Sequence, residues 1–318
     1  MLFDEKEKKY LPFYSSLLIT VVTILFFKLP SQFFFLFSFL PWLLIGLSTS
    51  NRNTAVSFII SQLIIITFLN FNENINSGTI YNFLILNIAL IGFLSFVITA
   101  SFKIQRNGKH FNIGNVLSIY LIIITFFLFI FLLFFYFQID FEPLISKIKE
   151  SFLKDIQTQD VVLYNRLMNI LEFSLKIFPA INSVTFFLIT VLNLSLSMKI
   201  LNKLNIKART EINYSNFSMP KYCLYLIFLM FVLVIFSSEN QQILSINLLI
   251  TFAVIYVVSG HLIILKKINK YDINIFLKIL LFFLLFIFFS YLLIIFLFFL
   301  GLIDQIKQTL HKNKMSGD

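Results

Sequence analysis

Residues 113–137 read IGNVLSIYLIIITFFLFIFLLFFYF, and this stretch contains no charged side chain. The hydrocarbon core of a bilayer is roughly 30 Å thick, and an α-helix of roughly 20 apolar residues crosses it. A helix also satisfies its own backbone hydrogen-bonding groups, which lipid cannot do. The stretch therefore predicts a transmembrane α-helix.

Further apolar runs before and after this stretch predict an all-α fold, a polytopic transmembrane helical bundle. We expect nine spans, over residues 12–27, 31–47, 54–71, 79–102, 113–137, 173–200, 221–236, 243–265 and 275–303. The first two spans are short, so a bundle of eight spans is the alternative. We expect the spans to form a single integral membrane domain over residues 1–318.

The overall composition favours a membrane protein over a water-soluble one. Of the 318 residues, 59% are hydrophobic and 13% are charged, whereas soluble domains carry about 25% charged residues. The net charge is +10, but the Lys and Arg lie in short loops between apolar runs, and no nucleic-acid motif accompanies them. We therefore expect the lipid bilayer as a partner and no nucleic acid.

Positive charge is distributed unevenly between the loops on the two sides of the predicted membrane. With nine spans, one side holds most of the basic residues: Lys6, Lys8, Lys9, Arg52, Lys103, Arg106, Lys109, Lys199, Lys203, Lys207, Arg209, Lys221, Lys266, Lys267, Lys270 and Lys278. Basic loops stay in the cytoplasm, so we expect a cytoplasmic N-terminus in the cell inner (plasma) membrane. Nine spans leave Lys307, Lys312 and Lys314 outside, which the same rule disfavours, whereas eight spans place them inside.

The polar stretch 138–172 separates the fifth predicted span from the sixth. Ile148, Phe152 and Ile156 recur in it at helical spacing, and charged residues fill the other face. This pattern is typical of an amphipathic helical segment that lies on a membrane surface. A solvated helical hairpin without lipid contact is the alternative.

The sequence lacks the motifs of the main enzyme classes. All acidic residues lie outside the apolar centres, which argues against a proton-driven transporter and against an aspartyl intramembrane protease. No G-x-x-x-x-G-K-[ST], G-x-S-x-G or H-E-x-x-H motif occurs, and Cys223 is the single cysteine. We therefore expect no enzyme activity, no metal and no cofactor.

The asparagines within the spans need hydrogen-bond partners, because lipid offers none. They are Asn87, Asn182, Asn193 and Asn247. Asn182 and Asn193 are 11 residues apart, about three helical turns, so we expect one face of the sixth span to present both. Contact between helices and contact with a polar ligand are the two roles open to these amides.

Five residues form the candidate ligand or structural polar site: Pro41, Pro179, Asn182, Asn193 and His261. A proline removes a backbone N–H and can free a carbonyl at membrane depth, and an amide supplies donors and acceptors without the cost of a charge. We expect these residues to approach one another around a neutral ligand. In the alternative, the prolines start or kink helices, the asparagines pack them, and His261 packs at the interface.

Four stretches carry a resemblance to a known family. They are FLPWLLIGL at 39–47, FPA at 178–180 followed by LNL at 192–194, VSGH at 258–261 and LGLIDQ at 300–305. In this order they resemble the uncharacterised membrane-protein family named domain of unknown function 2232, the YybS-like proteins. The resemblance covers nearly the whole chain, and the family typically has an acid where Asp304 stands. Ser259 stands where the family varies.

The resemblance implies a membrane protein without an established activity. Members of the family are similar to the substrate-binding subunits of energy-coupling-factor vitamin transporters, which bind a small molecule among membrane helices and draw on a partner ATPase. This similarity suggests a small-molecule-binding, transport-associated subunit that works with other membrane subunits or a partner ATPase. The alternative is a non-transport interaction or scaffold protein that organises other membrane components.

Overall fold

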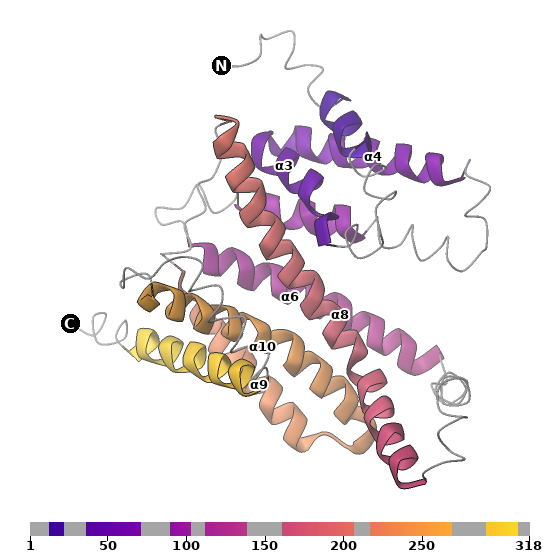
Figure 1. The fold of residues 1–318 in the computed structure, drawn as a ribbon, viewed down its shortest axis with the longest axis vertical. Helices are drawn as coiled ribbons and strands as arrows, with labels where there is room; N and C mark the ends of the chain where they lie inside the picture. The colour runs from indigo at the N-terminus through magenta and orange to yellow at the C-terminus, as the bar shows by residue number, and fades with distance from the viewer. Residues whose placement is uncertain are drawn as a thin grey trace. The chain divides into compact units, whose positions relative to one another are not determined.

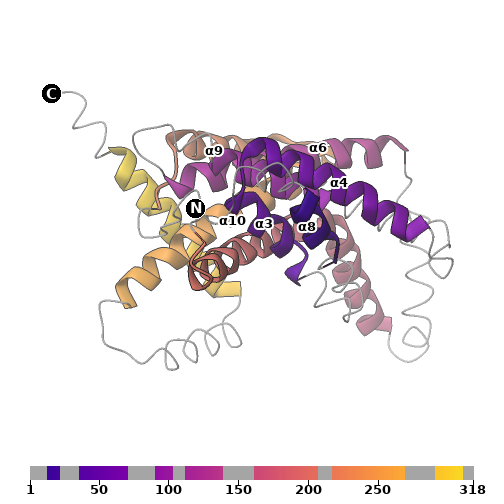
Figure 2. The same cartoon turned by 90° about the horizontal axis from the view of Figure 1, so that it is seen from above.

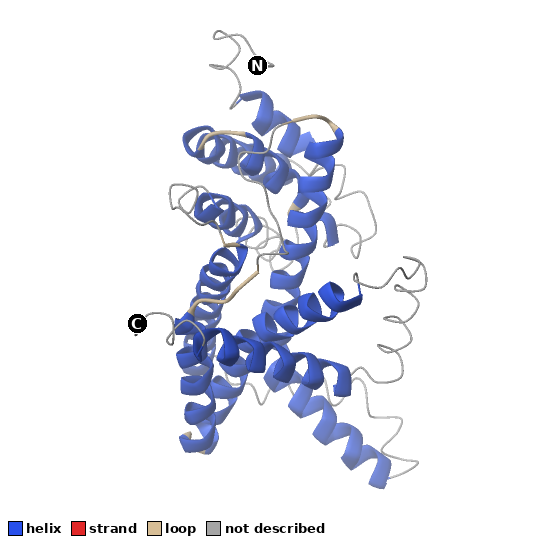
Figure 3. Cartoon of the chain, turned by 90° about the vertical axis from the view of Figure 1, so that its left-hand side faces the viewer, coloured by secondary structure: helices blue, strands red, loops and turns tan. Residues whose placement is uncertain are grey.

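The computed structural model describes residues 13–21, 36–70, 90–102, 112–138, 161–206, 217–268 and 291–310. Throughout these ranges the chain forms helices joined by turns and loops, and it contains no strand (Figure 3). For these residues the predicted all-α fold is confirmed.

Six helices have bounds that the structure defines (Figure 1). They are α3 (Leu40–Ser48), α4 (Asn51–Asn70), α6 (Ile113–Gln138), α8 (Val161–Lys203), α9 (Lys221–Phe236) and α10 (Glu239–Ile268). Residues 13–21, 90–102 and 291–310 are also helical. The last of these continues seven residues past the end that its apolar run predicts, and an Asp304–Gln308 hydrogen bond links successive turns of the extension.

Among the described residues, four helices are long and apolar enough to cross a membrane. They cover Ile113–Ile130, Arg166–Lys203, Gln241–Ile268 and Tyr291–Leu310. Three shorter apolar helices cover Arg52–Ile65, Leu90–Phe102 and Lys221–Phe236. The chain is therefore a helical protein with several membrane-compatible segments, while the count of eight or nine spans stays a prediction.

Only part of the predicted surface segment 138–172 can be compared with the structure, because residues 139–160 lie outside the described residues. Residues 161–172 form the first turns of α8, without a break before the predicted sixth span. With 43 residues, α8 is about 65 Å long, roughly twice the thickness of a bilayer core. The surface position of the segment stays a prediction.

The chain divides into two compact units. Unit 1 consists of Met1–Tyr120 and Phe187–Asn216, and unit 2 consists of Leu121–Phe186 and Phe217–Asp318. α8 contributes its second part to unit 1 and its first part to unit 2. The single integral domain that the sequence predicts stays a prediction.

Unit 1 has a core around Trp42, whose side chain is 1% exposed. Its indole meets the ring of Phe58 edge-on, with 4.9 Å between ring centroids, and Phe58 in turn meets Phe96. Gly46 of α3 lies directly against the side chain of Thr99. Small residues at such contacts let membrane helices approach closely, so α3, α4 and residues 90–102 pack as one group.

Unit 2 has a core around α9, α10 and residues 291–310. α9 and α10 form an antiparallel pair, and a 2.6 Å hydrogen bond between the hydroxyls of Ser237 and Ser245 joins them beside the turn. The helix at 291–310 lies beside α10 in both views (Figures 1 and 2).

Two glycines set the distance between α10 and the helix at 291–310. A Cβ added at Gly260 would collide with the backbone of Leu297, and one added at Gly301 would collide with the carbonyl of Tyr256. The two backbones are therefore in direct contact, which only glycine permits at these positions. Tyr256 also packs edge-on against Phe298, with 5.6 Å between ring centroids.

Candidate functional site

Pro179 interrupts the backbone hydrogen bonds of α8, and the side-chain amide of Asn247 on α10 bonds to the backbone groups that lose their partners. In an uninterrupted helix the Ala180 N–H would donate to the Lys176 carbonyl, but the ring of Pro179 disturbs the ladder here. Instead, Ala180 N donates to Asn247 Oδ1 at 2.9 Å, and Asn247 Nδ2 donates to the Lys176 oxygen at 2.8 Å. The Asn247 side chain is fully buried. Asn247 therefore closes the interruption and joins α8 to α10 within unit 2.

Asn193 makes a comparable contact within unit 1. Its Nδ2 donates to the carbonyl oxygens of Leu36 and Ile189, both at 2.8 Å. Its Oδ1 is buried without a hydrogen-bond partner. Contact between chain segments, the structural role open to the asparagines, is thus observed for both Asn193 and Asn247.

The structure separates the two asparagines that the sequence places on one face of the sixth span. Asn182 is exposed and belongs to unit 2, whereas Asn193 is 0% exposed and belongs to unit 1. Their shared helical face does not give them a shared environment, because different neighbours cover the two parts of α8. Each residue has to be considered with its own unit.

The other predicted site residues lie at helix starts and helix contacts. Pro41 is buried in the first turn of α3, where the missing N–H has no helical partner to lose. His261 is half-buried on α10, next to the contact at Gly260. Pro41 lies in unit 1 with Asn193, and His261 lies in unit 2 with Pro179. The convergence of all five residues on one ligand stays a prediction.

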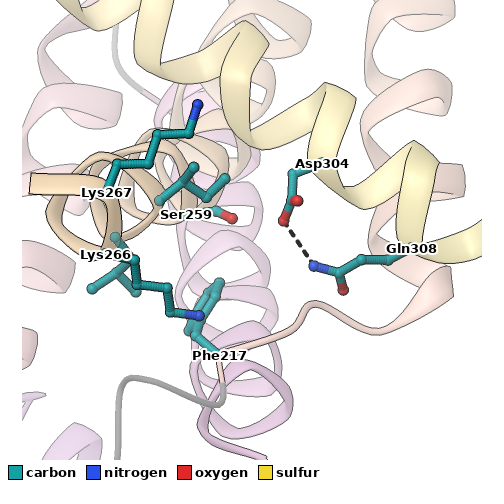
Figure 4. A pocket seen from close by; sticks show the side chains of 8 residues that line it. Phe217, Ser259, Lys266, Lys267, Asp304 and Gln308 are labelled. Atoms are coloured by element: carbon teal, nitrogen blue, oxygen red, sulfur yellow. Dashed lines mark hydrogen bonds between the residues drawn. The ribbon is translucent and has the colours of Figure 1, made fainter. Parts of the chain in front are cut away.

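A polar pocket that the sequence does not predict lies in unit 2, between the last turns of α10 and of the helix at 291–310 (Figure 4). Its volume is about 290 Å³. It is lined by Phe217, Ser259, Leu262, Ile263, Lys266, Lys267, Asp304 and Gln308. Five of these eight residues are polar or charged, and Phe217, Leu262 and Ile263 form an apolar wall.

The pocket contains charges of both signs that do not pair with each other. Asp304 Oδ2 accepts a 2.7 Å hydrogen bond from Gln308 Nε2, and Figure 4 shows both side chains entering from the same helix. Lys266 and Lys267 are exposed and leave α10 in different directions (Figure 4). Among the described residues, Glu172 and Lys176 form an ion pair, whereas no N–O distance between Asp304 and the two pocket lysines is within 4.0 Å.

Backbone contacts hold the pocket in shape. The Gly260–Gly301 crossing fixes the two helices, which run in the same direction, so their C-terminal turns face each other. Gln305 Nε2 donates to the carbonyl of Pro220 at 2.7 Å and holds the segment before α9 against the same end. Phe217 of that segment is 7% exposed and closes one side.

A sequence signal for this pocket exists in the spacing of the last helix. Gly301, Asp304 and Gln308 recur at intervals of three and four residues, and such intervals put side chains on one face of a helix. The facing residues on α10 cannot be found in this way, because they depend on how two helices pack. In the described part of the chain, no three His, Cys, Asp or Glu side chains gather as a metal site.

The comparisons with known proteins agree with the resemblance seen in the sequence. No curated protein and no solved structure is significantly similar to the chain. A family profile described as predicted membrane protein (DUF2232) matches residues 17–305. This range includes all four stretches that carry the resemblance and most residues of the pocket. The chain therefore belongs to the DUF2232 family of predicted membrane proteins.

Proposed function

We propose that this protein is a small-molecule-binding subunit of a transport system in the cell inner membrane, and that its ligand occupies the polar pocket of unit 2. The observation that carries the proposal is the set of opposite charges in the pocket, which line one 290 Å³ space without pairing. Ligand sites combine apolar walls with a few placed polar groups, and this pocket has both. Its position at the ends of two apolar helices suits a molecule that reaches the membrane from water.

The energy for transport comes from a partner in this proposal. The sequence has no nucleotide-binding loop of the G-x-x-x-x-G-K-[ST] type, and its acidic residues lie outside the apolar centres. A partner ATPase or another membrane subunit would supply the energy and would pack against an exposed apolar surface of this protein. α9 offers such a surface, because Phe228 is 71% and Ile235 is 72% exposed.

The pocket end of unit 2 faces the cytoplasm in this proposal. Lys266, Lys267 and Lys307 belong to the C-terminal turns that meet there, and Lys221 follows Pro220 at the same end. An excess of Lys marks the cytoplasmic side of a membrane protein. A cytoplasmic end of the last helix, together with a cytoplasmic N-terminus, requires an even number of spans.

A non-transport scaffold is the second candidate. The exposed apolar residues of α9 would then be covered by the membrane segments of the proteins that it organises. This candidate needs no occupied pocket, so the two functions differ in what the purified protein carries.

Purification in a mild detergent, followed by mass spectrometry of small molecules and proteins, tests the proposal. We expect wild-type protein to retain a small molecule that the Asp304→Asn variant loses. The Lys307→Gln variant is the matched control, because Lys307 is on the same helix and outside the pocket lining. Stoichiometric protein partners without any small molecule would contradict the transport role and favour the scaffold.

A further inference from the structure

The ligand class of the pocket follows from charges of opposite sign that do not pair with each other. Asp304 lies on the helix at 291–310, while Lys266 and Lys267 lie on α10. Opposite charges that line one pocket gain free energy when they pair, yet no N–O distance between Asp304 and these two lysines is within 4.0 Å. The pocket therefore presents one anionic and one cationic side to the space between them.

The distance between the two helices is fixed beside the pocket. The backbones of α10 and the 291–310 helix are already in contact at Gly260 and Gly301, so they cannot come closer. The amide of Gln308 holds one oxygen of Asp304 within its own helix. A molecule with charges of both signs would satisfy both sides at once.

We propose that the pocket binds a zwitterion that carries a primary ammonium group and a phosphate group. The ammonium donates hydrogen bonds to Asp304, and the phosphate oxygens accept from Lys266 or from Lys267, which leave α10 in different directions (Figure 4). Lysine binds phosphate as a point charge on a flexible side chain, which suits an exposed lysine at a helix end. Phe217, Leu262 and Ile263 form the apolar wall for the remainder of the molecule. This inference rests on the proposed function only in taking the pocket as a ligand site.

The same chemistry has two sources at the end of membrane helices. One is the headgroup of an ethanolamine phospholipid in the bilayer, and the other is a soluble amine phosphate from the cytoplasm. Both present an ammonium group that donates hydrogen bonds, which the trimethylammonium group of a choline headgroup cannot do.

The experiment measures binding to the detergent-purified full-length protein by native mass spectrometry. The probes are phosphatidylethanolamine, phosphatidylcholine of the same acyl chains, and soluble glycerophosphoethanolamine. We expect ethanolamine lipid to bind about tenfold or more tightly than choline lipid, since a hydrogen bond to a charged group is lost with choline. We expect Asp304→Asn to abolish this preference and Lys266→Gln with Lys267→Gln to weaken both lipids. Lys307→Gln should leave the preference unchanged.

The outcomes separate the sources and the two proposals. Competition by glycerophosphoethanolamine against the lipid supports a soluble ligand, and binding of the lipid alone supports a headgroup. Equal binding of ethanolamine and choline lipids, or a preference that survives Asp304→Asn, overturns the zwitterion. If wild-type protein then still retains another small molecule that Asp304→Asn loses, the transport role stands without it. Thermal unfolding of each variant in the same detergent confirms that it is folded.

Discussion

Replacing Asn247 with Leu removes the amide that bridges the interruption at Pro179. The substitution abolishes hydrogen bonds to Ala180 N, to the Lys176 oxygen and to the Ile243 oxygen. Side-chain hydrogen bonds in membrane proteins are worth about 0.6–1.7 kcal/mol each. The variant should therefore lose about 2–5 kcal/mol of unfolding free energy. Leucine has a similar size, so the lost free energy reports the hydrogen bonds more than a cavity.

The assay is reversible unfolding in mixed detergent micelles, followed by circular dichroism. Asn182→Leu is the matched control, because it changes the same residue type on the exposed side of α8. We expect the control to shift the unfolding free energy by less than about 0.5 kcal/mol.

A second substitution tests the cause of the destabilisation. Pro179→Ala in the Asn247→Leu background restores an N–H to α8 and lets Ala180 donate to Lys176 within the helix. We expect this double variant to recover most of the lost free energy. The reasoning would be refuted if the unfolding free energy of Asn247→Leu lay within about 0.5 kcal/mol of the wild-type value. It would also be refuted if the double variant recovered none of the lost unfolding free energy.

Three further predictions concern packing, the buried amide and topology. Gly260→Ala should destabilise the protein by about 1–3 kcal/mol in the same assay, because the added carbon collides with backbone. Gly92→Ala should cost less, because the carbon there collides with the flexible end of the Gln62 side chain and makes only an ordinary contact with Trp42. Equal losses of unfolding free energy in the two variants would argue against the backbone contact between the helices. Asn193→Leu should lower thermal stability and membrane abundance through the lost donor to a neighbouring carbonyl, whereas loss of a deletion phenotype at normal abundance would mark a ligand site instead. Reporter fusions at Asn74 and Asn205 should report opposite compartments, and agreement between them would contradict the predicted orientation.

Element type and several boundaries follow from local features of the sequence. The predicted span 221–236 coincides with α9, because Pro220 begins it and the apolar run ends at Ser237. The predicted span 31–47 overlaps α3, which begins at Leu40 and has Pro41 in its first turn, where a helix tolerates proline. The end of the helix at 291–310 was missed, because polar residues after Ile303 continue a helix as readily as apolar ones do.

The pairing of Pro179 with its partner shows where local reasoning stops. Because Pro179 lacks an N–H and disturbs the helical ladder, the sequence predicts that a polar group is needed beside it. Asn182 is the nearest amide along the chain. The structure supplies Asn247, which is far away in sequence and on another helix. Hydrogen-bond capacity is readable from residue type, but the choice of partner depends on which helices meet.

By itself, the sequence determined the helical class, the membrane character and the family, because each depends on residue type and on the length of apolar runs. It also identified residues whose polar groups need hydrogen-bond partners, because an unsatisfied polar group in lipid costs free energy wherever it lies. Only the tertiary structure decided which groups satisfy them, and it alone revealed the pocket at the ends of α10 and the 291–310 helix. The physical reason is that a pocket arises from the separation between backbones, and here two glycines on different helices set that separation.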